Sequence, residues 1–325
     1  MSQEKKPNPL LEEKIPLLTH HSSPAKSIWS IGGGKGGTGK SFISACLGIE
    51  LANLNQEVVL IDADLGGPNL HTFLGLKESP LDLGHFITNK VKALEETAVG
   101  TPFPHLKLVK GTESLLFAAN LNYYKKLKLI RHIKGFADKR VIVDIGTGAA
   151  YNTVDFFILS NPGVIVINPE PTSIENAYYF LKSCIVRIFK LYIDYYQIQD
   201  FIKNIAEQIH DTSKSVYSFL NEIISRDRTY AQVFFTALKH FRPSLIINKA
   251  RDEKDALLGE SMIKVVQKYL VVDLDFLGTI PFDEKVHLSL KEKKPFLEVY
   301  PESAVARAIK EIAQKLLQLS PNHAS

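Results

Sequence analysis

Short runs of consecutive apolar residues alternate along this chain with longer segments in which apolar residues recur every three or four positions. The runs Val141–Val143 and Val164–Ile167 have no polar face, which is typical of strands covered by helices on both sides of a parallel sheet. We therefore predict a doubly wound α/β fold with a mainly parallel sheet. The expected strands are Ser27–Ile31, Glu57–Ile61, Leu106–Val109, Arg140–Ile145, Val164–Ile167, Ser244–Ile247 and Leu274–Leu277.

One segment, from about residue 190 to 242, departs from this alternation and shows helical spacing instead. It predicts an insertion of about three helices, the third from Thr229 to Phe241. The apolar stripes would pack against each other and on the sheet, and a face left exposed would suit a protein partner. The two stripes before the third helix consist of Tyr195, Ile198, Ile202, Ile205 and Ile209, and of Val216, Phe219, Leu220, Ile223 and Ile224.

The two ends of the chain differ in character. Residues 1–26 are polar and carry four prolines, so we expect a flexible arm before a domain at 27–320 and a short tail at 321–325. The last helix has an apolar stripe that we expect to pack on the sheet, leaving little surface for lipid and only weak membrane contact. This stripe consists of Val305, Ile309, Ile312, Ala313, Leu316 and Leu317.

Composition sets limits on the class of protein. With 325 residues, 45% of them hydrophobic, the chain can bury the core of one large α/β domain. A net charge of +4 permits weak contact with DNA or anionic lipid but identifies neither. Cys46 and Cys184 form no C-x-x-C pair, which suits a reducing cytoplasm. We find no signal peptide and no membrane-spanning run, so we expect a cytoplasmic protein, with peripheral contact at the inner face of the membrane left open.

A glycine-rich stretch after the first strand carries the most specific chemistry. It matches the phosphate-loop pattern G-x-x-x-x-G-K-[ST] between an expected strand and an expected helix. Glycines let backbone N–H groups turn around a phosphate, Lys40 would reach the β- and γ-phosphates, and the Ser41 hydroxyl would bind Mg²⁺. This predicts a P-loop NTPase. The residues expected at the nucleotide are Gly34, Lys35, Gly36, Gly37, Thr38, Gly39, Lys40, Ser41 and Phe42.

Carboxylates follow two of the other expected strands. Asp144 ends an apolar run, the arrangement that places a carboxylate beside a nucleotide-bound Mg²⁺. Asp62 and Asp64 follow the second strand, where they can order water around a metal or activate one for attack. Because parallel strands end at the same edge of the sheet, all three should lie near the phosphate loop.

The run from Lys35 to Ser41 resembles the deviant Walker A signature, K-G-G-x-G-K-[ST], of the MinD/ParA superfamily of ATPases. In that family the first lysine, here Lys35, reaches the phosphates of a partner subunit in an ATP-bound dimer, although a solvated lysine is the plain alternative. The resemblance also implies that Asp64 orients the attacking water and that Asp62 supports the outer shell of the metal.

Further segments fit the MinD/FlhG branch of this family. Residues 169–174 read P-E-P-T-S-I, and residues 277–283 read L-G-T-I-P-F-D. The resemblance places Asn248 at the adenine ring, although an ordinary turn asparagine is the alternative. It implies a slow, dimerising ATPase that regulates the position or number of a cell structure, such as a flagellum or division site. A DNA-partition ATPase of the ParA type and a nucleotide-gated adaptor with little hydrolysis remain alternatives, and scattered lysines favour DNA binding only weakly.

Overall fold

The computed structural model describes residues 27–64, 66–76, 80–112, 121–136, 138–202 and 214–319. Within these ranges eight strands form one sheet, in the order β3-β4-β2-β5-β1-β6-β7-β8, and only β3 is antiparallel to its neighbour. The predicted doubly wound fold is confirmed. The strands are β1 (Ser27–Gly32), β2 (Val58–Ala63), β3 (Ala98–Gly100), β4 (Leu106–Val109), β5 (Arg140–Ile145), β6 (Val164–Ile167), β7 (Ser244–Ala250) and β8 (Asp275–Pro281).

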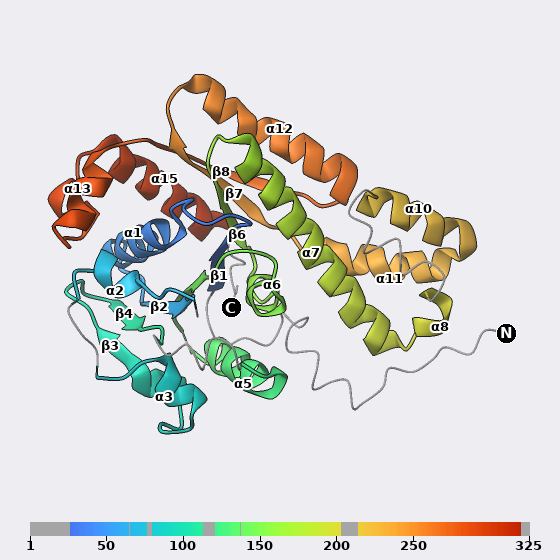
Figure 1. The fold of residues 1–325 in the computed structure, drawn as a ribbon, viewed down its shortest axis with the longest axis horizontal. Helices are drawn as coiled ribbons and strands as arrows, with labels where there is room; N and C mark the ends of the chain where they lie inside the picture. The colour runs from blue at the N-terminus through green and yellow to red at the C-terminus, as the bar shows by residue number, and fades with distance from the viewer. Residues whose placement is uncertain are drawn as a thin grey trace.

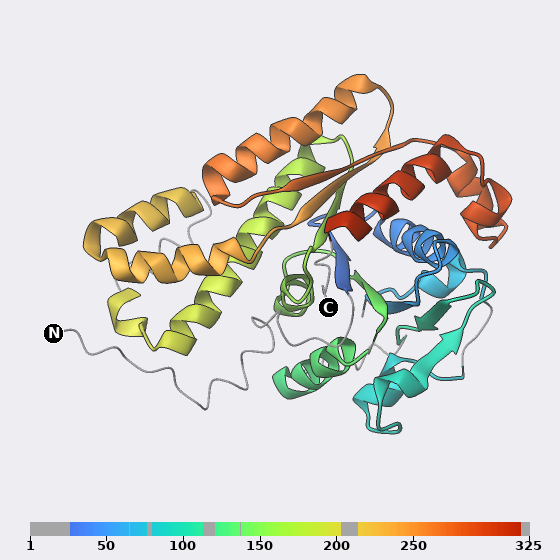
Figure 2. The same ribbon diagram turned by 180° about the vertical axis from the view of Figure 1, so that it is seen from behind.

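Helices cover both faces of this sheet (Figure 1). One face carries α3 (Leu83–Ile87), α5 (Tyr123–Lys134), α6 (Tyr151–Ile158), α7 (Pro171–Tyr196) and α12 (Glu253–Leu270). The view from behind shows α1 (Lys40–Asn53) beside α15 (Ala304–Leu319), which cover the other face (Figure 2). Short elements complete the described chain: α2 (Leu70–Phe73), the 3₁₀ helix η3 (Leu94–Thr97), α13 (Lys285–Lys291) and α14 (Phe296–Val299).

Some boundaries differ from those expected. The second strand extends to Ala63, so Asp62 lies inside the strand rather than after it. The strand that contains Asp144 has the expected bounds, Arg140–Ile145. The edge strand β3 was not expected, because three residues ending in glycine show no period-two pattern. The predicted arm (1–26), the tail (321–325), Ile205 and Ile209 lie outside the described residues.

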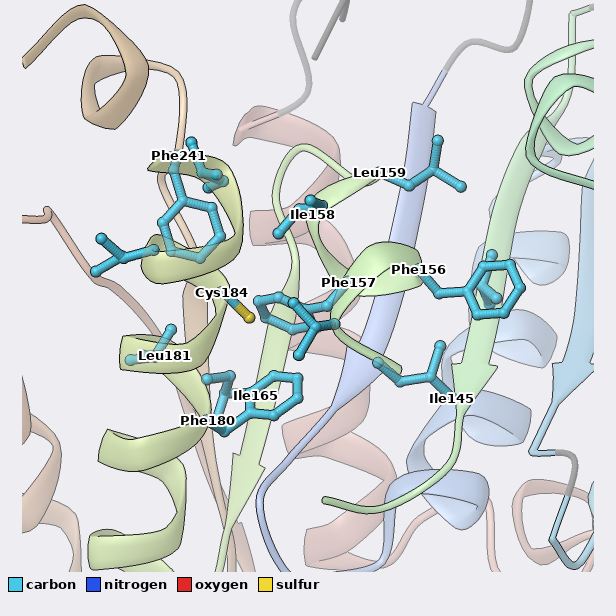
Figure 3. Close-up of a cluster of buried hydrophobic side chains, with 14 of the residues drawn as sticks. Ile145, Phe156, Phe157, Ile158, Leu159, Ile165, Phe180, Leu181, Cys184 and Phe241 are labelled. Atoms are coloured by element: carbon cyan, nitrogen blue, oxygen red, sulfur yellow. The ribbon is translucent and has the colours of Figure 1, made fainter. Parts of the chain in front are cut away.

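The ring of Phe157 brings α6 into direct contact with the sheet backbone. A Cβ atom at Gly32 would lie 2.9 Å from this ring, and one at Gly163 would lie 2.7 Å from it. The ring centroid is also 4.9 Å from that of Phe180 and 6.3 Å from that of Phe241 (Figure 3). Since Gly32 is the last residue of β1, this packing fixes the strand where it enters the glycine-rich loop.

A buried ion-pair network joins three of the helices on the face that carries α5, α6 and α7. Asp155 of α6 is fully buried and accepts two hydrogen bonds from Arg187 of α7, at 2.6 and 3.1 Å. It also pairs with Lys126 of α5. Loss of one partner from such a network leaves a buried charge and typically costs about 3–5 kcal/mol, so α5, α6 and α7 form one rigid layer.

The helical insertion consists of the second half of α7 with α8 (Gln199–Ile202), α10 (Val216–Arg226) and α11 (Arg228–Lys239). Phe189, Phe219 and Phe234 form its core, with ring centroids 4.7 to 5.7 Å apart. The second predicted stripe and the third predicted helix therefore pack against each other and against α7. Tyr217 and Phe235 remain 54% and 41% exposed.

Most of the apolar stripe of α15 is buried in the core. Val305, Ile309 and Leu316 are fully buried against α1 and β8. No helix in the described ranges is long and apolar enough to cross a membrane.

We predict that the protein stays in the bottom fraction when floated with anionic vesicles in the presence of ATP and Mg²⁺, because the apolar stripe of α15 is buried and not free to insert. The same protein with an added C-terminal amphipathic peptide is the positive control and should float. Strong ATP-dependent flotation of the unmodified protein would contradict this prediction.

Candidate functional site

A cavity of about 710 Å³ lies at the carboxyl ends of the central strands. The glycine-rich loop and the start of α1 line it, together with most residues of the segment from Ile280 to Leu290. Predicted site residues that line it are Gly37, Gly39, Lys40, Ser41, Phe42, Asp64 and Asn248. Residues from five strand ends, far apart in sequence, thus surround one cavity.

The loop requires glycine because neighbouring backbone comes very close. A Cβ atom at Gly34 would lie 2.1 Å from the carbonyl oxygen of Asn176 in α7. Gly39 has a φ of 93° and caps α1 without a side-chain hydrogen bond. The first N–H groups of α1 therefore point into the cavity without a side-chain partner at the cap, which suits a phosphate group.

Lys40 supplies positive charge inside this cavity. It is 6% exposed, and its Nζ donates to the carbonyl oxygen of Lys35 at 3.3 Å. Burial lowers its pKa, while the carboxylates of Asp144 and Asp64 oppose that shift. A lysine held close to the loop in this way can bind a phosphate oxygen without reorganising.

Asp144 and Ser41 fit a bound Mg²⁺. The Oδ1 atom of Asp144 accepts a hydrogen bond from Ser44 at 3.0 Å, whereas its buried Oδ2 atom has no hydrogen-bond partner among the described residues. Burial raises the pKa of Asp144 to about 6, although hydrogen bonds from Ser41 and Ser44 favour its charged form. One carboxylate and one hydroxyl suit Mg²⁺, which keeps several waters or phosphate oxygens as its other ligands.

Asp62 lies beside Asp144 on the neighbouring strand and is fully buried. Its Oδ1 accepts from the N–H of Asp64 at 3.3 Å and its Oδ2 from the N–H of Leu70 at 3.0 Å. Burial and the charge of Asp144 raise its pKa to about 7. Asp62 thus holds both ends of the segment that carries Asp64, and its role in the outer shell of the metal stays a prediction.

Asp64 lines the cavity, and its role in orienting water stays a prediction. Its Oδ1 accepts from the N–H of Gly66 at 3.0 Å, and a Cβ at Gly146 would lie 3.0 Å from the same oxygen. The carboxylate therefore packs against the loop that follows Asp144.

Lys35 does not line the cavity. Its Nζ contacts Glu170 Oε2 at 2.8 Å and Thr172 Oγ1 at 3.0 Å, and its side chain is 38% exposed. The hydrogen bond and charge of Lys35 lower the pKa of Glu170. We did not predict Glu170; its position at the start of α7, after a strand ending beside the loop, is the signal that could have revealed it.

Asn248, near the end of β7, lies beside the loop and is 4% exposed. Its Nδ2 donates to the carbonyl oxygen of Thr38 at 2.7 Å, and the residue lines the cavity. Phe42 anchors α1 by packing against Phe296, with ring centroids 5.4 Å apart.

A glycine loop between β1 and α1, with a buried lysine and a carboxylate on a neighbouring strand, defines a phosphate-loop nucleotide-binding protein. Residues 29–296 match the family model of the CobQ/CobB/MinD/ParA nucleotide binding domain, and the chain belongs to this family. The predicted resemblance is thereby confirmed.

Two relatives and one solved structure illustrate the family. The antiactivator FleN of Pseudomonas aeruginosa is 25% identical over 291 residues, covering 89% of this chain and 85% of FleN. The flagellum site-determining protein YlxH of Helicobacter pylori is 30% identical over 155 residues, covering 47% of this chain and 52% of YlxH. The septum site-determining protein MinD of Pyrococcus horikoshii, solved with Mg-ADP, matches with a TM-score of 0.62 at 20% identity, covering 91% and 97% of the two chains.

We predict that Asp144→Asn raises the stability of the nucleotide-free protein at pH 8. The folded-state pKa of Asp144 lies above its ordinary value of 3.8, so its stability contribution is lost as pH rises through about 6. Asparagine avoids that loss, which we expect to be worth about 3 kcal/mol at pH 8 and about half of that at pH 5.

Thermal melts at the two pH values measure this effect. The exposed Asp200→Asn is the control and should melt as the wild type does at both. A lower melting temperature for Asp144→Asn at pH 8 would show that Asp144 stabilises the empty site.

Proposed function

We propose that this protein is an ATP- and Mg²⁺-dependent switch of the MinD/FlhG branch, which dimerises with ATP bound and hydrolyses it to ADP and phosphate. Its cellular role would be to regulate the position or number of a structure such as a flagellum or division site. The printed names of FleN and YlxH support this role, because both match this chain.

The position of Lys35 carries the proposal of a dimer. Lys40 already supplies a cation inside the cavity, whereas Lys35 lies at the surface beside the loop. Its ion pair with Glu170 is exposed, and exposed ion pairs contribute little free energy. Lys35 could therefore leave Glu170 and bind another anion. The phosphates of a second subunit facing this surface would be such an anion.

The residues of the cavity support hydrolysis. Ser41 and Asp144 would hold Mg²⁺, which neutralises charge on the phosphates when it is bound. Lys40 would bind the terminal phosphates, and Asp64 would accept a hydrogen bond from the attacking water and so orient it. Asp62 would keep Asp64 in place through its two backbone hydrogen bonds.

The fixed amide of Asn248 supports adenine as the base. One N–H of its Nδ2 binds the carbonyl oxygen of Thr38, and its Oδ1 would accept a hydrogen bond from the exocyclic amine of adenine. Guanine carries a carbonyl oxygen at that position, which would face another acceptor. ATP should therefore bind better than GTP.

The helical insertion is our proposed partner site. Tyr217 of α10 and Phe235 of α11 are exposed aromatic side chains next to a well-packed aromatic core. Aromatic residues presented on a rigid support are typical of protein-binding surfaces.

We predict that Lys40→Ala abolishes binding of ATP in isothermal titration, because the phosphates lose their buried cation. Wild-type protein should bind ATP more tightly than GTP and should need Mg²⁺ for full affinity. Unchanged ATP affinity of Lys40→Ala, in a protein that still melts cooperatively, would remove the basis of the site assignment.

We predict that Asp64→Ala hydrolyses ATP at least tenfold more slowly and accumulates as a dimer with ATP, because the nucleotide still binds while its water is no longer oriented. Adding Lys35→Ala should restore the monomer. Analytical ultracentrifugation with saturating ATP measures both effects, and a monomeric Asp64→Ala protein would count against the dimer.

A further inference from the structure

Two consecutive residues at the end of β7, Asn248 and Lys249, hold two consecutive carbonyl groups of the phosphate loop. The Nδ2 of Asn248 donates to the carbonyl oxygen of Thr38 at 2.7 Å. The Nζ of Lys249 donates to the carbonyl oxygen of Gly37 at 2.9 Å. Lys249 was not among the predicted site residues, although it also lines the nucleotide cavity.

A regular strand could not make both contacts. Consecutive side chains of a β-strand point to opposite faces, so only one of the two would reach the loop. Lys249 has a φ of 59°, in the left-handed region, and the pairing of β7 with β8 is irregular between Ile247 and Ala250. This departure turns the two side chains toward the same loop. A lysine whose backbone is in the left-handed region costs free energy. Such strain persists where the surrounding contacts hold the backbone in that conformation.

The contacts determine where the N–H groups of the loop point. In a trans peptide the carbonyl group of one residue and the N–H of the next point in opposite directions. Holding the carbonyl of Gly37 therefore orients the N–H of Thr38, and holding the carbonyl of Thr38 orients the N–H of Gly39. Gly37 and Gly39 have φ values of 77° and 93°, and glycine backbone changes conformation easily.

We propose that Lys249 is a positioning residue, which keeps the phosphate loop in its binding conformation before the nucleotide arrives. This inference rests on the proposed binding of ATP. It assigns to Lys249 a contact with the loop backbone, distinct from the direct phosphate contact expected of Lys40.

The variant Lys249→Gly separates this role from a role in stability. Glycine adopts a φ near 59° without strain, so the variant should melt at the same temperature as the wild type or higher. Its affinity for ATP should nevertheless fall roughly tenfold, because one charged hydrogen bond to the loop is lost. Lys249→Arg retains a donor and should recover part of the affinity.

Lys293→Gly is the matched control, since Lys293 is also a lysine with a left-handed φ, of 54°. It should melt like the wild type or higher and bind ATP with unchanged affinity. Wild-type affinity in Lys249→Gly would overturn the proposal.

Amide NMR signals of the nucleotide-free protein distinguish positioning from direct phosphate binding. We expect the signals of Thr38 and Gly39 to shift or broaden in Lys249→Gly and to stay unchanged in Lys293→Gly. Loss of affinity with unchanged signals at Thr38 and Gly39 would mean that Lys249 binds the phosphate itself, and would also overturn the proposal. Since these spectra contain no nucleotide, they test the contact even if the wild-type protein fails to bind ATP.

Discussion

The phosphate loop is held on two sides by backbone and side chains that leave it little freedom. On one side Gly34 lies against the backbone of Asn176 in α7, where even a Cβ atom would clash at 2.1 Å. On the other side the end of β7 binds the carbonyl groups of Gly37 and Thr38. A loop that binds phosphate through N–H groups needs its carbonyl groups directed elsewhere, and these two supports meet that need.

The same helix that supports the loop also carries the helical insertion. Thr172, in the first turn of α7, contacts Lys35, while Phe189 near the other end belongs to the aromatic core with α10 and α11. A helix of 26 residues spans roughly 39 Å. The nucleotide site and the exposed aromatic residues of the insertion are therefore joined by one continuous, rigid element, which is also tied to α5 and α6 through Asp155.

The site is built at a cost to the stability of the fold. Asp62 and Asp144 are buried on adjacent strands, and burial together with their mutual repulsion raises the pKa of Asp62. Lys40 is buried with them, and its pKa is lowered. Such groups would be replaced by apolar residues if stability alone were selected, so their presence marks the chemistry of the site.

The sequence by itself determined the features whose residues lie close together along the chain. The strand, glycine loop and helix around Lys40, the apolar strand that contains Asp144, and the buried stripe of α15 all follow from local patterns of spacing. The strand β3 was not predicted, because its three residues are too few to show a periodic pattern. Only the tertiary structure decided which distant groups meet: Lys35 with Glu170, 135 residues away, and Lys249 with Gly37, 212 residues away. These contacts depend on the order of strands in the sheet and on one left-handed residue, and neither leaves a periodic signal in the sequence.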